Sequence, residues 1–302
     1  MNRRNFTKAV AVGLAAHLPQ LLRGQRPKQL KIGLSTLAWN VSRTSLDNFE
    51  LSLKDTYELG YWGFETVAPI IETWDADGSL ARLVEKYRVR LKAGYIDVNV
   101  TDPSVRKEHI ANVIRLAKLV KKHGGNYVVM STNGRRRQQA PDTFNFAEHE
   151  ANMAAALNEY GMAVVDLGLR AGLHPHTGSV VEKRDEVYGI MNAVDPRYMS
   201  FAPDTGQIQK GGADAAQVVK DFAKITTHMH LKDYSNGKYM GGYCPLGMGV
   251  VDIESILNTV EEAGTQADVM HELDRGNAPM TARETAAFSK AYLTRLGYQF
   301  QR

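Results

Sequence analysis

Short apolar runs alternate with longer amphipathic stretches from Gln29 to the end of the chain. The short runs have the length of β-strands, and some, such as 126–131, are apolar on both faces, which is typical of parallel strands covered by helices. The longer stretches place apolar residues at helical spacing; in 104–123 they form one stripe, while Arg and Lys take the opposite face. The expected strands are 30–36, 62–67, 90–98, 126–131, 168–174, 199–204, 226–232 and 268–272. The expected helices are 46–59, 76–88, 104–123, 144–160, 182–192, 214–222, 252–263 and 280–295.

This alternation predicts an α/β fold, a single (β/α)₈ TIM barrel over residues 29–302. The chain of 302 residues shows no break in composition that would mark a second domain. An open doubly wound sheet is the alternative, but no glycine-rich dinucleotide-binding loop follows the first expected strand. The glycine-rich segment 235–250 follows the seventh strand, and we expect it to form a loop over the barrel mouth. It could instead be a plain connector; for cradling phosphate it lacks a lysine at the Walker position.

Residues 1–28 are interpreted as an export signal and linker. The twin-arginine consensus is matched by Arg3, Arg4, Phe6 and Lys8, and the mildly apolar stretch that follows is too short to span a bilayer comfortably. A frayed N-terminal helix is the alternative. The signal predicts export of the folded protein to the periplasm or outside the cell, without a stable membrane anchor. Cys244 is the sole cysteine, so an intramolecular disulfide is excluded.

The formal net charge of +4 does not indicate a nucleic-acid partner. Residues 1–24 contain four basic residues and no acidic ones, so the remainder of the chain is formally neutral. A neutral protein has no electrostatic footprint for a polyanion. The one basic run, 135–137, is interpreted as a solvated loop, although it could steer an anionic substrate.

Metal-binding side chains stand at the ends of four expected strands. His174 and His176 end the fifth strand, Asp204 the sixth and Glu272 the eighth, while the seventh carries a row of alternating polar residues, His228, His230 and Lys232. Alternation places the members of this row on one face, where burial is costly unless they are paired or bound to metal. In a parallel barrel the carboxyl ends of the strands form the catalytic face, and imidazole and carboxylate groups gathered there are typical of a divalent metal site.

These segments resemble the sugar phosphate isomerase/epimerase superfamily, which shares the xylose-isomerase-like TIM barrel. The similarity lies in Pro-Asp-Thr-Gly at 203–206, His-Met-His-Leu-Lys-Asp at 228–233, Gly-Phe-Glu at 63–65 and the last strand ending in Glu272, and it covers about residues 30–295. It implies one divalent metal ion (Mn, Co, Mg or Zn), held by Asp204, His230 and Glu272. Members usually supply a fourth ligand, a Glu, at the end of the fifth strand. This chain has His174 there, so the resemblance implies His174 as that ligand, with His176 close behind.

We also expect a set of catalytic and substrate-binding residues, of which the resemblance implies the role of Glu272 as a base. Glu272 is the expected base, with Glu65 as the other candidate, and Lys232 is expected to stabilise an enolate oxygen or protonate a leaving oxygen. Lys232 could instead be only an ion-pair partner for Asp233 or Glu272. The expected substrate contacts are Trp39, His176, Gln207, Asp233 and Arg275. Trp39 could serve as a wall for a sugar ring or could simply pack in the core.

The expected activity is metal-assisted proton abstraction next to a carbonyl of a keto-sugar or cyclitol. An imidazole at position 174 removes one of two opposed carboxylates, which makes two-sided epimerisation less favourable than a single-base isomerase or a lyase/dehydratase. An AP-endonuclease-like phosphodiesterase and a non-catalytic sugar-binding barrel are the alternatives. A small-molecule sugar is the expected partner, and the fold class allows a homo-oligomer.

Overall fold

Eight parallel strands form the centre of the computed structural model, which describes residues 28–132, 144–237, 240–274 and 280–302. The first six strands each pair with their neighbours along the chain, the seventh pairs with the eighth, and the eighth pairs with the first. The strands are β1 (Ile32–Ser35), β2 (Phe64–Val67), β3 (Leu91–Asp97), β4 (Tyr127–Ser131), β5 (Arg170–His174), β6 (Ser200–Phe201), β7 (His228–Leu231) and β10 (Asp268–His271). All eight overlap the strands expected from the sequence.

Between β6 and β7 the barrel is closed by two isolated parallel bridges rather than by a continuous ladder. Phe201 pairs with Thr226, and Asp204 pairs with His230. In addition, the His230 N–H donates to the Pro203 carbonyl at 2.9 Å. The (β/α)₈ prediction is therefore confirmed, and the second bridge joins two of the residues expected to bind metal.

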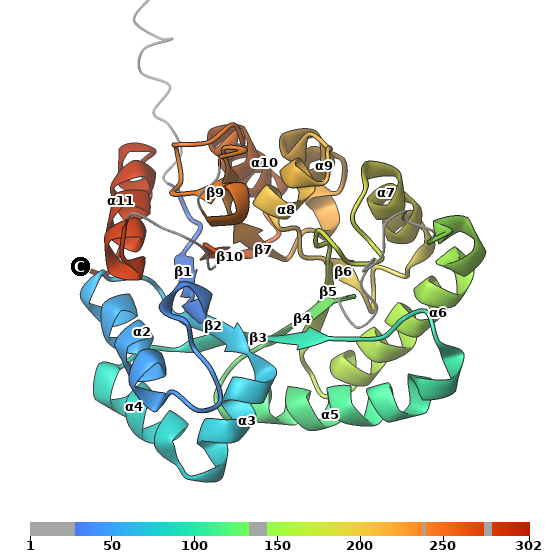
Figure 1. The fold of residues 1–302 in the computed structure, drawn as a ribbon, viewed down its shortest axis with the longest axis horizontal. Helices are drawn as coiled ribbons and strands as arrows, with labels where there is room; N and C mark the ends of the chain where they lie inside the picture. Colours follow the sequence, from blue (N-terminus) through green and yellow to red (C-terminus); the bar gives the residue numbers. More distant parts are fainter. Residues whose placement is uncertain (1–27, 133–143, 238–239, 275–279) are drawn as a thin grey trace, which may run out of the picture.

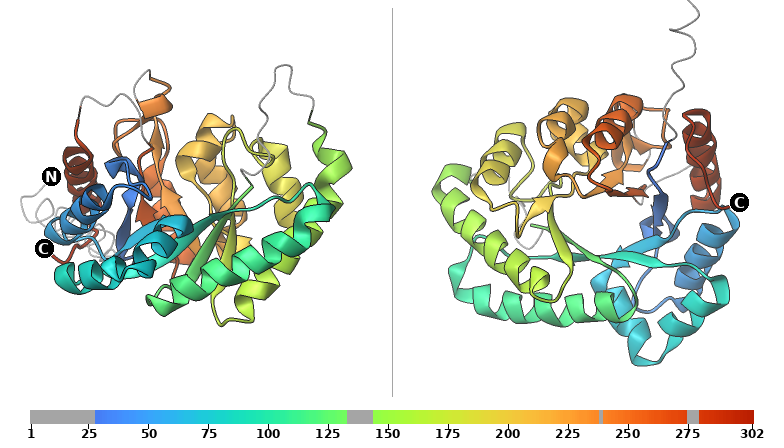
Figure 2. Two further views of the ribbon diagram at one scale, coloured as in Figure 1. Left: turned by 60° about the horizontal axis from the view of Figure 1, so that its bottom comes forward. Right: turned by 180° about the vertical axis from the view of Figure 1, so that it is seen from behind.

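Helices surround the strands on the outside of the barrel (Figure 1), and the view from behind shows the same ring (Figure 2). Eight of them coincide closely with expected helices: α2 (Leu46–Glu58), α4 (Ser79–Tyr87), α5 (Arg106–Lys122), α6 (Phe146–Val165), α7 (Arg184–Ala193), α9 (Ala215–Asp221), α10 (Ile253–Ala263) and α11 (Ala282–Arg295). The apolar stripe predicted for 104–123 faces inward, since Val113, Leu116, Ala117 and Val120 are all buried. No helix among the described residues is both long and apolar enough to cross a membrane.

Two α-helices among the described residues were not expected from the sequence. The first, α3 (Ala68–Ala76), begins directly after β2 and has a proline in its first turn. A proline is tolerated there because N–H groups of the first turn make no hydrogen bond within the helix. It ends before Gly78, whose φ of 76° separates it from α4, so the single helix expected over 76–88 starts later than predicted. The second, α8 (Thr205–Lys210), begins immediately after Asp204. Both are short, and a short segment shows too little periodicity to be recognised.

The glycine-rich segment after β7 contains a small antiparallel pair, β8 (Asp233–Tyr234) with β9 (Tyr243–Cys244). Past β9, the N–H groups of Gly247, Gly249 and Val251 all donate to the carboxylate of Asp233 at 2.9 to 3.1 Å. A Cβ on Gly249 would lie 2.1 Å from Asp233 Oδ1, so this close approach requires glycine. These three amides bind an internal carboxylate and are therefore not available to a phosphate.

Candidate metal centre

The polar strand-end residues meet inside the barrel. Asp204, which follows β6, His174 at the end of β5 and His230 on β7 offer ligand atoms within 4.8 Å of one another. Glu272, which follows β10, reaches the same place, since its Oε2 lies 3.1 Å from His230 Nδ1. All four side chains are buried. The four residues expected to hold a metal are thus brought together.

His174 presents one defined nitrogen to this cluster. Its Nδ1 lies 3.1 Å from the Ala202 carbonyl, which can only accept a hydrogen bond, so Nδ1 carries the proton. Nε2 therefore keeps its lone pair, and it lies 3.8 Å from Asp204 Oδ2. Burial and the neighbouring His230 hold the pKa of His174 well below its usual value, which favours the neutral form that a metal requires.

Asp204 divides its two oxygens between the fold and the cluster. Oδ1 caps α8 by accepting the N–H of Gln207 at 2.9 Å. Oδ2 has no hydrogen bond with ideal geometry to a described residue and lies 2.8 Å from Lys232 Nζ. Burial raises the pKa of Asp204, although Lys232 opposes the shift.

Lys232 lies among three carboxylates. Its Nζ is 2.8 Å from Asp204, 2.7 Å from Glu272 and 3.0 Å from Asp274, and the side chain is 0 % exposed. Burial lowers the pKa of Lys232, but these carboxylates outweigh it and hold the pKa well above the usual value. Gly206 leaves room for the aliphatic part of the Lys232 side chain, because a Cβ at position 206 would lie only 2.7 Å from Lys232 Cγ. Of the two ion-pair partners considered from the sequence, Glu272 is in contact with the ammonium.

The balance of charge in the cluster fits a divalent cation. Asp204, Glu272 and Asp274 surround the one ammonium of Lys232. Burial raises the pKa of Glu272, but His230 and Lys232 outweigh it and hold the pKa well below its usual value. Buried negative charge in excess needs protons on the imidazoles or a metal ion. His230 Nδ1, Asp204 Oδ2 and Glu272 Oε2, all buried without an ideal hydrogen bond to a described residue, are suited as ligand atoms.

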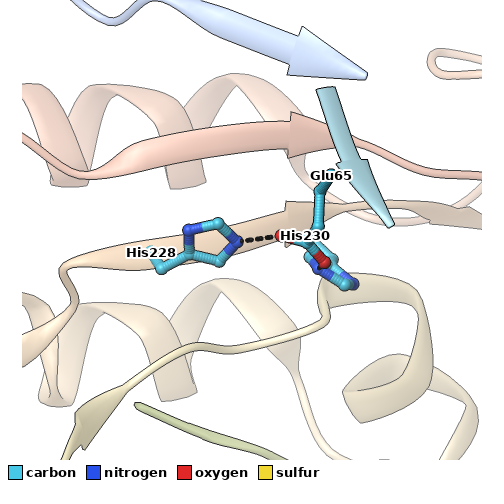
Figure 3. Close-up of side chains that lie close together, drawn as sticks. All are labelled: Glu65, His228 and His230. Atoms are coloured by element: carbon cyan, nitrogen blue, oxygen red, sulfur yellow. Dashed lines mark hydrogen bonds and ion pairs between the residues drawn. The ribbon is translucent and has the colours of Figure 1, made fainter. Parts of the chain in front are cut away.

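Glu65 contacts the other side of His230. Its Oε1 lies 2.6 Å from His230 Nε2, and its Oε2 lies 2.7 Å from His228 Nε2 (Figure 3). Burial raises the pKa of Glu65, but the two imidazoles outweigh it and bring the pKa to about 2. Because both oxygens already contact imidazole nitrogens, this geometry favours a role in positioning over the substrate-facing base considered from the sequence.

Gln207 and His176 belong to a hydrogen-bonded group beside the cluster. The Gln207 amide oxygen accepts from Thr177 and from the Tyr243 hydroxyl, which turns its amino group toward His176 Nε2 at 2.8 Å and Asp274 Oδ2 at 2.9 Å. His176 Nδ1 in turn donates to the Thr177 carbonyl at 2.8 Å. His176 is therefore held by Gln207, whereas His174 faces Asp204. Contact of either residue with a substrate stays a prediction.

Two expected substrate contacts have other roles in the structure. Trp39 is buried in the core, and its Nε1 donates to Asp55 Oδ2 of α2 at 2.8 Å; these contacts favour core packing, and the sugar wall stays a prediction. The Asp233 carboxylate accepts hydrogen bonds from four backbone N–H groups, which favours a structural role, and its contact with a substrate stays a prediction. Arg275, the basic run 135–137 and the export signal before residue 28 lie outside the described residues.

Two tyrosines near the cluster were missed by the sequence reasoning. The half-buried ring of Tyr95 on β3 lies 5.3 Å from the ring of His174 and 6.2 Å from that of His230. The ring of Tyr243 lies 4.9 Å from Lys232 Nζ. A signal for Tyr95 was its place near the carboxyl end of an expected strand, but Tyr243 comes from the glycine-rich segment, which carried no such signal.

Comparison with known proteins supports both the fold and the family. A family model described as a xylose isomerase-like TIM barrel matches residues 53–292. The chain is 24% identical over 192 residues to an inosose dehydratase from Clostridium botulinum strain Alaska E43, a match that covers 56% of this chain and 64% of that relative. It is 23% identical over 296 residues to the inosose dehydratase of strain Eklund 17B, and this match covers 88% of the chain and 96% of the relative.

Solved structures show the same fold at lower identity. A probable 3-DHS dehydratase from Bacillus anthracis has a TM-score of 0.71 and 15% identity, covering 88% of this chain and 99% of that one. The IOLI protein, solved with a bound zinc atom, has a TM-score of 0.70 and 19% identity, covering 89% and 98%. At these identities the likeness establishes the barrel architecture.

Proposed function

Because this chain belongs to the xylose isomerase-like TIM barrel family, we propose that it is a divalent-metal-dependent lyase that removes water from a keto-sugar or cyclitol. Its curated relatives are inosose dehydratases. The observation that carries the proposal is the contact of Lys232 Nζ with Glu272 Oε1 at 2.7 Å, beside the His174, Asp204 and His230 group. This contact places a proton acceptor, Glu272, next to a proton donor, Lys232.

The metal would be held by His174, Asp204, His230 and Glu272, whose ligand atoms suit Mn²⁺, Co²⁺, Mg²⁺ or Zn²⁺ to different degrees. When bound, such an ion polarises a substrate carbonyl and so acidifies the neighbouring C–H bond. The His174 and His230 imidazoles add no negative charge to the site, so the ion keeps more of its Lewis acidity than it would among carboxylates alone.

Glu272 and Lys232 perform the proton transfers. The pKa of Glu272 is held well below its usual value by His230 and Lys232, in spite of burial, so the carboxylate is ionised and free to accept a proton. Because a low pKa makes it a weak base, the transfer depends on a C–H bond acidified by the polarised carbonyl. The C–H electron pair forms the enolate, which expels the hydroxyl on the next carbon. Lys232 donates a proton to that oxygen, and water leaves. The proton gained by Glu272 then returns to Lys232 across the same contact.

This arrangement favours elimination over two-sided epimerisation. His174 stands at the end of β5, where the resemblance implies a carboxylate, so no second carboxylate base comes from that strand. Glu272 and Lys232 contact each other, so they address the same face of the substrate. The predicted elimination is consequently syn.

An assay with an inosose in D₂O, followed by NMR, tests the proposal. The chain is purified without metal and reloaded with Mn²⁺, Co²⁺, Mg²⁺ or Zn²⁺ in turn. We expect metal-dependent loss of water with an enone absorbing in the ultraviolet. Deuterium incorporation with inversion and no loss of water would point instead to epimerisation. A chain that binds none of these ions and converts no keto-sugar or cyclitol would refute the proposal.

Export remains part of the same proposal. The twin-arginine match at Arg3 and Arg4 supports a location outside the cytoplasm. Replacing both residues with lysine should retain the protein in the cytoplasm of a bacterium with a twin-arginine pathway, as seen by cell fractionation. Equal export of the wild type and the double variant would contradict this location.

A further inference from the structure

Glu65, His228 and His230 form a buried group in which only His230 has a role in the proposed reaction. Glu65 comes from β2 and the two histidines from β7, and their side chains are 2 %, 0 % and 1 % exposed. Figure 3 shows the carboxylate of Glu65 between the two imidazoles. Burying three ionisable groups is costly unless each one compensates another, so the group is expected to have a function.

Hydrogen bonding to Glu65 determines which nitrogen of His230 is available. The contact of 2.6 Å between Glu65 Oε1 and His230 Nε2 has the length of a charge-assisted hydrogen bond, in which the carboxylate can only accept. This bond keeps a proton on Nε2. Nδ1 faces Glu272 Oε2 at 3.1 Å, so it is the nitrogen that would give up its proton to an ion bound at the cluster. Nδ1 is the nitrogen on the side of the candidate ligand cluster. A histidine that donates its second nitrogen to a carboxylate is the arrangement that fixes a metal ligand.

His228 lies next to the other oxygen of Glu65. Its Nε2 lies 2.7 Å from Glu65 Oε2, and its ring stacks on Tyr127 with the centroids 4.6 Å apart. Tyr127 is anchored in its turn, because its hydroxyl lies 2.6 Å from Ser200 Oγ, which donates to the Ala171 carbonyl. The chain of contacts therefore runs from the barrel wall through His228 and Glu65 to His230.

We propose that Glu65 is a positioning residue that orients His230 so that Nδ1 faces the ion, and that His228 acts through Glu65 to the same end. The inference rests on the proposed metal centre. It differs from a second metal site at the same three residues, whose ligand atoms also lie within 4.8 Å of one another. A second ion would take the Nε2 proton away and make Glu65 a ligand.

The test measures binding of Mn²⁺ alone to the purified full chain by calorimetry and electron paramagnetic resonance. The variants are Glu65→Gln, which leaves one oxygen for two imidazoles, and His228→Phe, which keeps the ring but removes its nitrogens. Tyr127→Phe is the matched control, since it removes a buried hydroxyl next to His228 and keeps the stacked ring. Circular dichroism checks that each variant folds.

We expect one equivalent of Mn²⁺ in the wild type and a loss of affinity of about 10- to 100-fold in Glu65→Gln. His228→Phe should weaken binding by a smaller factor, and Tyr127→Phe, which keeps the ring stacked on His228, should weaken it less than either. In the Zn²⁺-loaded wild type, long-range ¹⁵N NMR should find the His230 proton on Nε2. This last measurement needs no variant, so it decides the question even if Glu65→Gln fails to fold.

The possible failures are distinguishable. A wild type that binds no Mn²⁺ refutes the metal centre itself. Binding of one equivalent that Glu65→Gln and His228→Phe leave unchanged refutes the positioning role alone. Two equivalents, with one lost in Glu65→Gln, would make Glu65 a ligand and overturn the inference, as would a His230 proton on Nδ1 in the Zn²⁺ form.

Discussion

Lys232 and Glu272 form an ion pair inside the barrel, with Nζ 2.7 Å from Oε1 and side chains that are 0 % and 3 % exposed. The two residues follow the neighbouring strands β7 and β10, which pair in parallel register. Each side chain shifts the pKa of the other toward the charged form against the effect of burial. The pair is therefore charged at neutral pH and coupled to the candidate metal ligands through Asp204 and His230.

Replacing Glu272 with Gln should abolish turnover while preserving the fold. The amide has the same shape but cannot accept a proton, and the loss of a general base costs about 10²- to 10⁴-fold in rate. Lys232 keeps Asp204 and Asp274 as partners, so the barrel should stay folded. The measurements are kcat with the metal-loaded protein and circular dichroism. Full activity in this variant would contradict the role of Glu272.

Replacing Lys232 with Met should destabilise the protein strongly. Removing the ammonium leaves Asp204, Glu272 and Asp274 without their shared partner, and breaking a buried ion pair in this way costs about 3–5 kcal/mol. The free energy of unfolding in urea is the measurement.

Lys92→Met provides the matched control for that change. Lys92 lies 2.8 Å from Asp268, but its side chain is 24 % exposed and Arg170 also reaches Asp268. Because the pair is partly exposed and Asp268 keeps Arg170 as a partner, Lys92→Met should cost clearly less than Lys232→Met. Equal losses in Lys92→Met and Lys232→Met would show that the three carboxylates around Lys232 do not need the ammonium.

Replacing His174 with Ala should weaken metal binding, because His174 Nε2 faces Asp204 Oδ2 and is expected to be a ligand. His174→Glu should restore binding, since it returns the carboxylate that the resemblance implies at this position. His176→Ala tests the neighbour, which the sequence left as a second candidate. Its Nε2 is held by Gln207, so this change should leave the affinity for Mn²⁺ unchanged. If His176→Ala loses more affinity for Mn²⁺ than His174→Ala does, then His176 is the ligand and His174 is not.

The Cys244 thiol should react slowly in the folded protein. It is 8 % exposed, and burial, with Asp233 nearby, raises its pKa to about 11. The thiolate is the reactive form, so at pH 8 the rate with a disulfide reagent should be about a hundredfold below that of a free cysteine, and should rise as the pH rises toward 11. Because the chain has one cysteine, the signal is unambiguous. A rate at pH 8 equal to that in urea would contradict the burial.

Local pattern accounts for the success of the fold prediction. Each strand and most helices show their own periodicity within a dozen residues, so their positions could be predicted without knowledge of their neighbours. Short elements such as α3 and α8 were missed because they lack this signal. The residues at the strand ends could likewise be named, since a parallel barrel brings all carboxyl ends to one face.

The sequence by itself determined which chemical groups stand at the mouth of the barrel, because strand ends and residue types are local properties. Only the tertiary structure decided how those groups pair. Glu65 meets His228 and His230 from another strand, Lys232 gathers three carboxylates, and Asp233 turns to backbone amides. These pairings depend on strand register and on the closure between β6 and β7. Neither can be predicted from the residues of one segment alone.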